Sequence, residues 1–128
     1  MRVYVDTSAA AKLMLLEAES VALQSFANRN DVELVSSTLL ETELRRIAIR
    51  NQIPQAMVTR ILDGISMFDL AGSDFKSAGL LPGETLRSLD ALHLQGAVVA
   101  EVDCVLTYDT RMSELAEASV GIPVIQPH

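Results

Sequence analysis

Apolar residues along the chain recur with two different spacings, which predict strands and helices in alternation. Short runs rich in β-branched and aromatic residues predict strands at residues 2–5, 32–36, 104–108 and 123–125, with a further short strand at 66–70. Longer stretches with helical spacing predict helices at residues 9–16, 19–29, 38–50, 54–62, 85–102 and 110–118, with a shorter one at 74–81. This alternation indicates an α/β fold in three layers, α/β/α, with a central parallel sheet of four to five strands.

Length and composition fit one folded unit, and we expect residues 1–128 to form a single domain. Hydrophobic residues make up 49% of the chain and the mean hydropathy is +0.27, which argues against disorder. Cys104 is the only cysteine, so a disulfide framework is excluded and a reducing compartment fits. No apolar run approaches the ~20 residues needed to cross a bilayer. We therefore expect a cytoplasmic protein without a membrane partner.

Net charge at first argues against a nucleic-acid partner. The chain has 17 acidic and 10 basic residues, a formal net charge of −7, whereas nucleic-acid-binding domains are usually basic. The positions of the acidic residues change this interpretation, because four of them occupy places where a carboxylate is unusual.

Two of these acids directly follow predicted strands. Asp6 follows the first strand and Asp109 follows the strand at 104–108. Ligands of open parallel sheets bind outside the carboxyl ends of the strands, so both side chains are expected at the same edge of the sheet. The alternative is helix N-capping, which aspartate performs well and which is common after a strand.

Glu43 interrupts the apolar face of the helix predicted at 38–50. It lies three residues after Leu40 and four before Ile47, and these positions share one face at about 100° per residue. Glu41 falls away from that face and is expected in solvent. A carboxylate removed from water costs several kcal/mol unless it is paired or binds a metal. The alternatives for Glu43 are therefore an ion pair with an arginine or a boundary position.

Asp90 repeats this pattern near the centre of the most apolar predicted helix, four residues after Leu86 and four before Leu94. A cation is needed there, and Arg87, three residues earlier, is the local candidate. A divalent metal would serve better because it can satisfy several carboxylates together. For His93, three residues further on, a structural or supporting role is favoured.

Together, the four acids predict a metal site at one end of the sheet. Like charges gathered there would repel one another and raise the pKa of some members unless a cation were present. Carboxylate oxygens suit hard divalent ions, so Mg²⁺, with Mn²⁺ as a substitute, is the expected cofactor. Nothing in the sequence offers the histidine and cysteine cluster typical of zinc.

Five motifs in order resemble PIN-domain ribonucleases, and specifically the VapC toxins of bacterial type II toxin–antitoxin pairs. They cover almost the whole chain apart from residues 51–83, which carry little signature. The motifs are Val3–Ser8, Ser36–Ser37 followed by Thr42–Leu44, Arg87–Leu94, Leu106–Arg111 and Gly121–Ile125.

The resemblance implies a Mg²⁺-dependent endoribonuclease that is inhibited by a cognate antitoxin, whose tail occupies the acidic groove. Family members are usually homodimers. Asp6, Glu43, Asp90 and Asp109 match the four acids of the family, and Asp6 and Asp90 match those most regularly assigned as metal ligands. Small hydroxyl residues that support the site in the family are matched by Thr7, Ser8 and Thr107.

Basic residues flank these acids in the sequence. Arg46 follows Glu43 on its helix, together with Arg45 and Arg50, while Arg87 precedes Asp90 and Arg111 follows Asp109. We expect Arg46, Arg87 and Arg111 to contact RNA phosphates. Ordinary solvated helix faces and salt bridges are the alternative. Without the four site acids the formal net charge of −7 would be −3, so much of the acidity belongs to one predicted pocket.

Two other functions are alternatives to a nuclease. A receiver-type signalling module also gathers carboxylates and Mg²⁺ at strand ends, but it needs an acidic pair after the first strand, where this chain has Asp6 followed by Thr7. A PIN-like module that binds RNA or protein without cutting it is the second alternative, and the presence of all four acids argues against it. A Rossmann or P-loop site is excluded because the chain has no glycine-rich loop.

Overall fold

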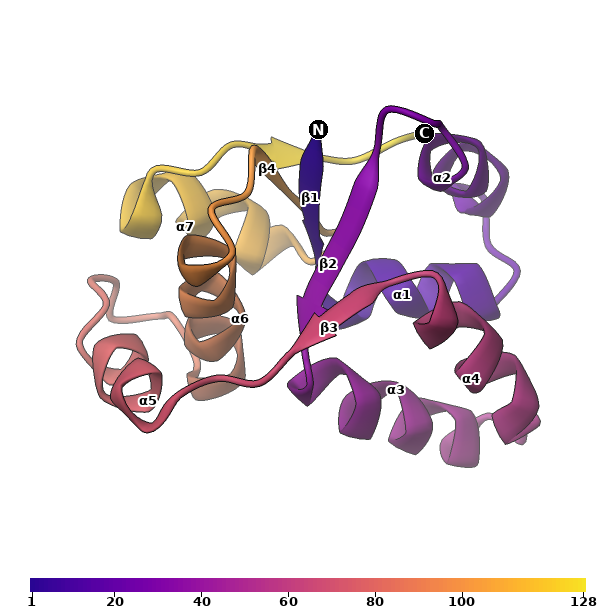
Figure 1. The fold of residues 1–128 in the computed structure, drawn as a ribbon, viewed down its shortest axis with the longest axis horizontal. Coiled ribbons are helices and arrows are strands. Elements are labelled where there is room, and N and C mark those ends of the chain that lie inside the picture. The colour runs from indigo at the N-terminus through magenta and orange to yellow at the C-terminus, as the bar shows by residue number, and fades with distance from the viewer.

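The computed structural model describes residues 1–128, and its centre is a parallel sheet of five strands (Figure 1). The strands lie in the order β3-β2-β1-β4-β5, and every neighbouring pair is parallel. Their bounds are β1 Arg2–Val5, β2 Glu33–Ser37, β3 Ser66–Phe68, β4 Cys104–Leu106 and β5 Val124–Ile125. The predicted α/β fold with four to five parallel strands is confirmed.

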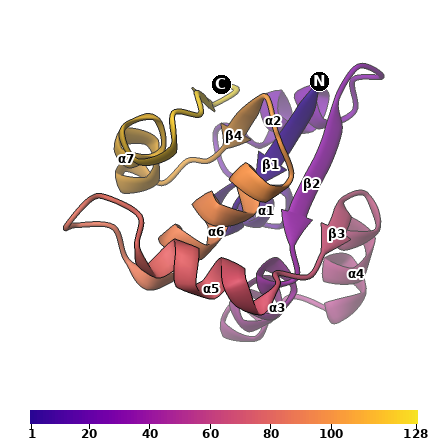
Figure 2. The same cartoon turned by 60° about the vertical axis from the view of Figure 1, so that its left-hand side comes forward.

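The chain has seven helices, and six of them cover the two faces of this sheet, which makes three layers (Figure 1). One face is covered by α1 Thr7–Met14, α2 Ser20–Ala27, α3 Leu39–Arg50 and α4 Gln55–Asp63. The other is covered by α6 Ser88–Val99 and α7 Thr110–Val120. The remaining helix, α5 Gly72–Gly79, packs alongside α6 (Figure 2). None of the seven is both long and apolar enough to span a bilayer.

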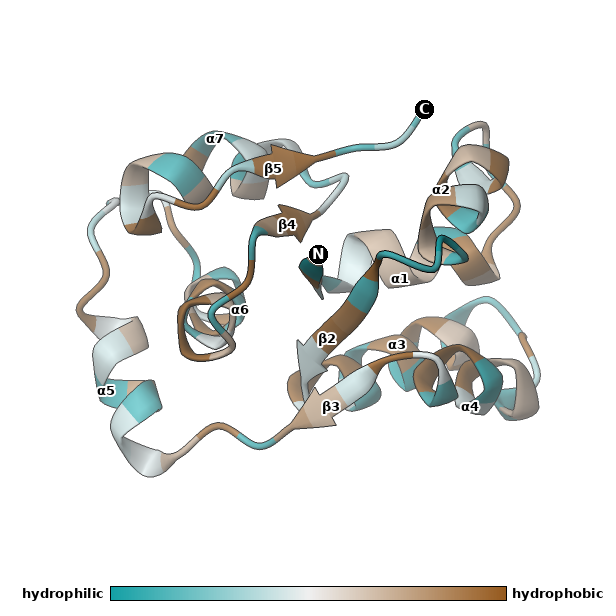
Figure 3. Ribbon diagram, turned by 45° about the horizontal axis from the view of Figure 1, so that its top comes forward, coloured by the Kyte–Doolittle hydropathy of each residue, from teal (hydrophilic) through white to brown (hydrophobic).

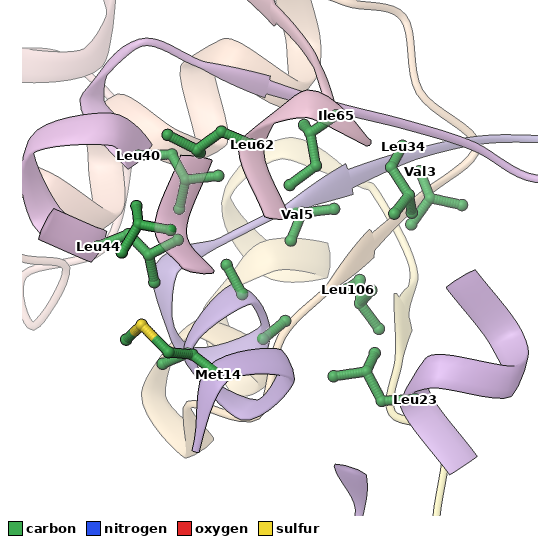
Figure 4. Close-up of a cluster of buried hydrophobic side chains, with 14 of the residues drawn as sticks. Val3, Val5, Met14, Leu23, Leu34, Leu40, Leu44, Leu62, Ile65 and Leu106 are labelled. Atoms are coloured by element: carbon green, nitrogen blue, oxygen red, sulfur yellow. The ribbon is translucent and has the colours of Figure 1, made fainter. Parts of the chain in front are cut away.

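Successive side chains of β1 point to opposite faces of the sheet and so belong to two separate hydrophobic cores. Val3 and Val5 point into the larger core, which also contains Leu40 and Leu44 of α3 (Figure 4). Tyr4 points the opposite way, into the smaller core beneath α6 and α7. Successive strand residues face opposite sides of a sheet, so a central strand buried on both faces reads as a continuous apolar run.

Hydropathy follows the same layers. The strands β4 and β5 are hydrophobic throughout, whereas helices such as α3 and α4 carry hydrophobic and hydrophilic segments in alternation (Figure 3). On α3 the buried face consists of Leu40, Leu44 and Ala48, spaced one turn apart, with Arg46 and Arg50 exposed on the outside. Burial of one stripe per helix is what holds each helix against the sheet.

Strand order reverses its direction of growth between β1 and β4. The chain builds outward from β1 to β2 and β3 on one side, then returns to add β4 and β5 on the other. Such a reversal is a topological switch point, and ligands of open α/β sheets bind outside the carboxyl ends of the strands there. Receiver modules have the different order 2-1-3-4-5. The receiver alternative is therefore excluded by the order of the strands.

The helix predicted at residues 85–102 is shorter at both ends, because α6 spans Ser88–Val99. Gly83 has a φ of 118°, a turn conformation that only glycine adopts without strain, and Arg87 is extended with a ψ of 162°. Leu86 therefore belongs to the turn and not to the helix, although its apolar character extends the helical pattern in the sequence. Most other boundaries agree with the prediction within about two residues.

Candidate active site at the carboxyl edge of the sheet

Asp6 lies at the switch point, directly after β1 and as the N-cap of α1. Its backbone N–H donates to the Leu106 carbonyl of β4, which ties it to the neighbouring strand. The carboxylate oxygen Oδ1 accepts from Ser8 Oγ at 2.7 Å and from the Ala9 backbone N–H at 3.0 Å. Thr107 Oγ1 donates to the other oxygen, Oδ2. The capping interpretation therefore holds for Asp6, together with two further bonds that capping does not require.

Burial dominates the electrostatics of Asp6, whose exposed fraction is 3%. Removal from water raises the pKa of this carboxyl above its ordinary value, and the hydrogen bonds from Thr107 and Ser8 lower it only in part. The ionised form of Asp6 is thus less stable here than in water. A cation beside the carboxylate would offset this cost.

Ser8 and Thr107 each donate their hydroxyl hydrogen to the Asp6 carboxylate, and their hydroxyl oxygens lie 3.1 Å apart. Ser8 Oγ further accepts from the Tyr108 backbone N–H, and Thr107 Oγ1 accepts from that of Asp109. This hydroxyl pair links the segment after β1 to the segment after β4. These contacts hold the ends of β1 and β4 at a fixed distance from each other.

Asp109 caps α7, since its Oδ1 accepts from the Met112 backbone N–H at 2.9 Å. Two residues further along the chain, Arg111 of α7 forms an ion pair with Asp90, and the charge of Asp109 raises the pKa of Asp90. The structure therefore brings together one acid from the end of β4 and one from the start of α6.

Asp90 lies in the first turn of α6, and its Oδ2 is buried without a hydrogen-bond partner. Burial raises the pKa of Asp90 first, and the charge of Asp109 adds to this, while Arg111 opposes it. Arg111 Nη1 stands 3.6 Å from Oδ2 as an ion pair. The cation beside Asp90 is thus Arg111 and not the local candidate Arg87, because Arg87 is extended outside the helix and the spacing of a helical turn does not apply to it.

Glu43 sits on α3 at the border of its buried face, with 22% of its side chain exposed, whereas the Glu41 side chain is 53% exposed. Its Oε1 is 2.7 Å from Nε2 of His93 on α6. The predicted contrast between Glu43 and Glu41 is confirmed. The partner of Glu43 is a histidine from another helix and not an arginine.

His93 joins the residues of this site that come from different elements, although the sequence predicts only a structural or supporting role for it. Its ring is buried, and Nε2 also lies 3.4 Å from Thr7 Oγ1. Its Nδ1 lies 2.8 Å from the Tyr4 hydroxyl oxygen, so the ring contacts residues of β1, α1 and α3. A signal was present in the sequence, because His93 lies one turn after Asp90 on an apolar helix.

Of the three arginines predicted to contact substrate, only Arg111 has a partner within the site. Arg46 and Arg87 are exposed, and no ion pair holds them. Arg45 is instead bound to Glu41, Gln55 and Thr59 on the outer side of α3 and α4. The two exposed guanidinium groups are available for an external anion.

The four acids lie at the carboxyl edge of the sheet, but their side chains do not form a complete metal-coordination site. No three histidine, cysteine, aspartate or glutamate side chains are close enough to hold a metal ion. The donor chemistry still fits a hard divalent cation: the donors are carboxylates, Asp6 is buried, and one oxygen of Asp90 is buried without a hydrogen bond. An orphaned buried oxygen is costly, and a bound cation would satisfy it.

Comparison with known proteins adds to this geometry. The PIN domain family matches residues 3–118. Ribonuclease VapC35 of Mycobacterium tuberculosis is 36% identical over 132 aligned positions, which cover 98% of this chain and 96% of that protein. The range 3–118 matched by the family contains the positions of all four acids.

Solved structures share the same fold. Mycobacterium tuberculosis VapC20, a sarcin-ricin loop cleaving toxin, aligns with a TM-score of 0.71 and 16% identity over 94% of this chain and 98% of its own. VapBC2 from Rickettsia felis, bound to a DNA fragment from its promoter, aligns with a TM-score of 0.67 and 12% identity over the whole of both chains. Since the family match spans most of the sequence and a full-length relative is 36% identical, this chain belongs to the VapC family of PIN-domain proteins.

Proposed function

We propose that the protein is a Mg²⁺-dependent endoribonuclease and the toxin of a toxin–antitoxin pair. The observation that carries this proposal is a buried, multiply hydrogen-bonded Asp6 at the switch point of a fold shared over its full length with ribonuclease VapC35. The buried Oδ2 of Asp90, which has no hydrogen bond, supports the metal requirement.

Asp6 and Asp90 are the proposed primary metal ligands. Ser8 and Thr107 keep the Asp6 carboxylate in one orientation by donating to both of its oxygens. Asp109 completes the acidic group beside Asp90. When bound, Mg²⁺ supplies an activated water at neutral pH and neutralises charge that develops on the phosphate.

Glu43 is proposed to orient the attacking water or to bind the metal through water, because its carboxylate is partly open to solvent and held by His93. Arg46 and Arg87 are proposed to bind RNA phosphates outside the acidic edge. Arg111, which forms an ion pair with Asp90, is the third arginine proposed to bind an RNA phosphate, and a metal held by Asp90 would leave its guanidinium free to do so.

The test is cleavage of a labelled RNA by purified protein, with Mg²⁺, with Mn²⁺ and with excess EDTA. We expect cleavage only with metal, and a loss of at least about 100-fold in Asp6→Asn and in Asp90→Asn, since the acids act as a unit. Asp63→Asn is the matched control because Asp63 is exposed at the end of α4. Cleavage that persists in EDTA would refute the metal mechanism, and RNA binding without cleavage would favour the non-catalytic alternative.

An antitoxin partner is part of the same proposal. A peptide tail that carries arginine would complement the acidic edge and the net charge of −7. We expect co-expression of the neighbouring small reading frame to relieve growth inhibition and to yield a co-purified complex. Sedimentation of the free protein tests the expected homodimer. If the small protein neither relieves toxicity nor co-purifies, the toxin assignment fails while the nuclease assignment stands on its own test.

A further inference from the structure

Glu43 and His93 reach each other from opposite layers of the molecule. Glu43 belongs to α3 on the face of the larger core, whereas His93 belongs to α6 on the face of the smaller core (Figure 1). Their contact of 2.7 Å joins residues 50 apart in the sequence. A glutamate side chain has several rotatable bonds, and without this contact a partly exposed carboxylate would occupy several rotamers.

Tyr4 holds the other side of the imidazole ring. Its hydroxyl oxygen is 2.8 Å from Nδ1 of His93, and its ring is completely buried. A carboxylate can only accept, so the hydrogen on Nε2 faces Glu43 while Nδ1 faces the tyrosine hydroxyl. Turning the imidazole over would break both contacts, and the ring is therefore fixed in one orientation.

The tyrosine is itself anchored in the middle of the sheet. Tyr4 lies on β1 between Val35 of β2 and Val105 of β4, and its hydroxyl is 3.1 Å from Ser37 Oγ. The Ser37 backbone N–H also donates to this hydroxyl at 3.3 Å. A chain of contacts thus runs from the rigid centre of the sheet through Tyr4 and His93 to Glu43 at its edge.

A histidine that served only the core would find both partners within the core. His93 has 4% of its side chain exposed, yet its Nε2 is directed to a carboxylate that stays partly open to solvent. The contact therefore aligns a group at the site edge, in addition to satisfying a buried ring. Outer partners of this kind orient the groups that bind metals and substrates.

We propose that Tyr4 and His93 are positioning residues that hold the Glu43 carboxylate in place for divalent-metal binding and RNA cleavage. This inference deepens the proposed nuclease function and rests on it. Neither residue touches the metal or the RNA. Both act only through Glu43.

The test compares Tyr4→Phe, His93→Leu and His93→Gln with the wild type. Mn²⁺ affinity is measured by calorimetry without RNA, and kcat and KM for RNA cleavage are measured at saturating Mg²⁺. We expect Tyr4→Phe and His93→Leu to lose about 10–100-fold in Mn²⁺ affinity or in kcat with little change in KM. His93→Gln retains more, because the glutamine amide can still donate to Glu43.

Two comparisons separate positioning from general stability. In a Glu43→Ala background, His93→Leu should cause no further loss of Mn²⁺ affinity or kcat, because residues that act through one another are not additive. Tyr108→Phe is the matched control, because it also removes a tyrosine hydroxyl, which donates a partly buried hydrogen bond to the Pro127 carbonyl. The Tyr108 hydroxyl lies outside the chain of contacts that runs through Tyr4 and His93 to Glu43. It should keep both the affinity and the kcat of the wild type.

Wild-type Mn²⁺ affinity and kcat in Tyr4→Phe and His93→Leu would overturn the inference, as would a fully additive loss in the Glu43→Ala background. If His93→Leu does not fold, Tyr4→Phe and His93→Gln decide by the same criteria. If the wild type binds Mn²⁺ but leaves RNA intact, the nuclease proposal fails and the affinity comparison still decides the inference. A wild type that binds no Mn²⁺ contradicts both.

Discussion

Asp90 is a partly buried acid whose charge lowers the stability of the metal-free fold and would be neutralised by a bound cation. It stands in the first turn of a helix, where the positive end of the helix dipole favours an anion. Burial and the neighbouring charge of Asp109 act in the opposite direction and raise the pKa of Asp90. Arg111 at 3.6 Å compensates in part. Sites that hold unsatisfied charge commonly trade stability for function.

Removing this charge should stabilise the metal-free protein. Because the pKa of Asp90 is higher in the folded than in the unfolded chain, the folded state binds the proton more tightly, and stability falls as the pH rises through the interval between the two values. Asp90→Asn lacks this loss. In EDTA we expect its melting temperature to exceed that of the wild type by a few degrees at pH 8, with a difference that narrows as the pH falls through the interval between the folded and unfolded pKa values of Asp90.

Thermal unfolding followed by circular dichroism measures this difference, with Asp63→Asn as the control. Asp63 is exposed, and changes at such positions usually alter stability by less than about 0.5 kcal/mol. A lower melting temperature for Asp90→Asn at pH 8 would show that the ion pair with Arg111 outweighs the cost of burial.

Gly96 makes room for Tyr4. A methyl group at Gly96 would stand 2.9 Å from the tyrosine hydroxyl oxygen and 3.0 Å from Cε2, and the ring is completely buried. Alanine normally favours a helix over glycine by about 1 kcal/mol, but overpacking a core costs about 1–3 kcal/mol. We therefore expect Gly96→Ala to lower the free energy of unfolding. Gly79→Ala, which meets nothing within 4 Å, should leave it unchanged or raise it slightly.

Urea unfolding of both glycine variants provides this comparison. The fully buried Tyr4 cannot swing into solvent, so a shift of the ring would also disturb its contact with His93. Equal or higher stability of Gly96→Ala would contradict close packing between α6 and β1.

At the scale of elements, α6 shows what local patterns predict and what they miss. The apolar spacing places Asp90 on this helix, and the strand patterns place Asp6 and Asp109 at strand ends, all from neighbouring residues alone. The pairs Glu43–His93 and Asp90–Arg111 join separate helices. Such contacts depend on how helices pack across the sheet, which the spacing within one helix does not encode. For the same reason, the sequence favoured Arg87 over Arg111 as the partner of Asp90.

The start of α6 gives a prediction that separates stability from RNA binding. Arg87 occupies the N-cap position in an extended conformation, and its side chain makes no capping hydrogen bond. Serine is a strong N-cap, so Arg87→Ser should raise the free energy of unfolding by about 0.5–1 kcal/mol. If Arg87 contacts one RNA phosphate, the slope of log affinity against log salt should fall by about 0.7 for a single strand.

RNA binding is measured in an Asp6→Asn background, where the RNA is expected to stay intact. Lys76→Ser is the control for charge, because Lys76 is exposed on α5. An unchanged affinity and salt slope for Arg87→Ser would make Arg87 an ordinary solvated residue.

At the scale of the whole molecule, the strand order explains how an acidic protein can act on an anionic polymer. The reversal between β1 and β4 places two strand ends side by side at one edge of the sheet, and helices from both layers add Glu43 and Asp90. Part of the net charge of −7 is thereby concentrated at one edge, where a divalent cation would neutralise it. The remaining surface includes exposed arginines, so the overall charge does not oppose RNA binding.

The central claim is tested most directly by mapping RNA ends in cells after induction of the wild type and of Asp6→Asn at equal protein levels. The account predicts new 5′ ends at a small number of sites with the wild type and none with Asp6→Asn, whose altered side chain removes the buried carboxylate at the switch point. Identical end profiles for the two proteins would contradict it.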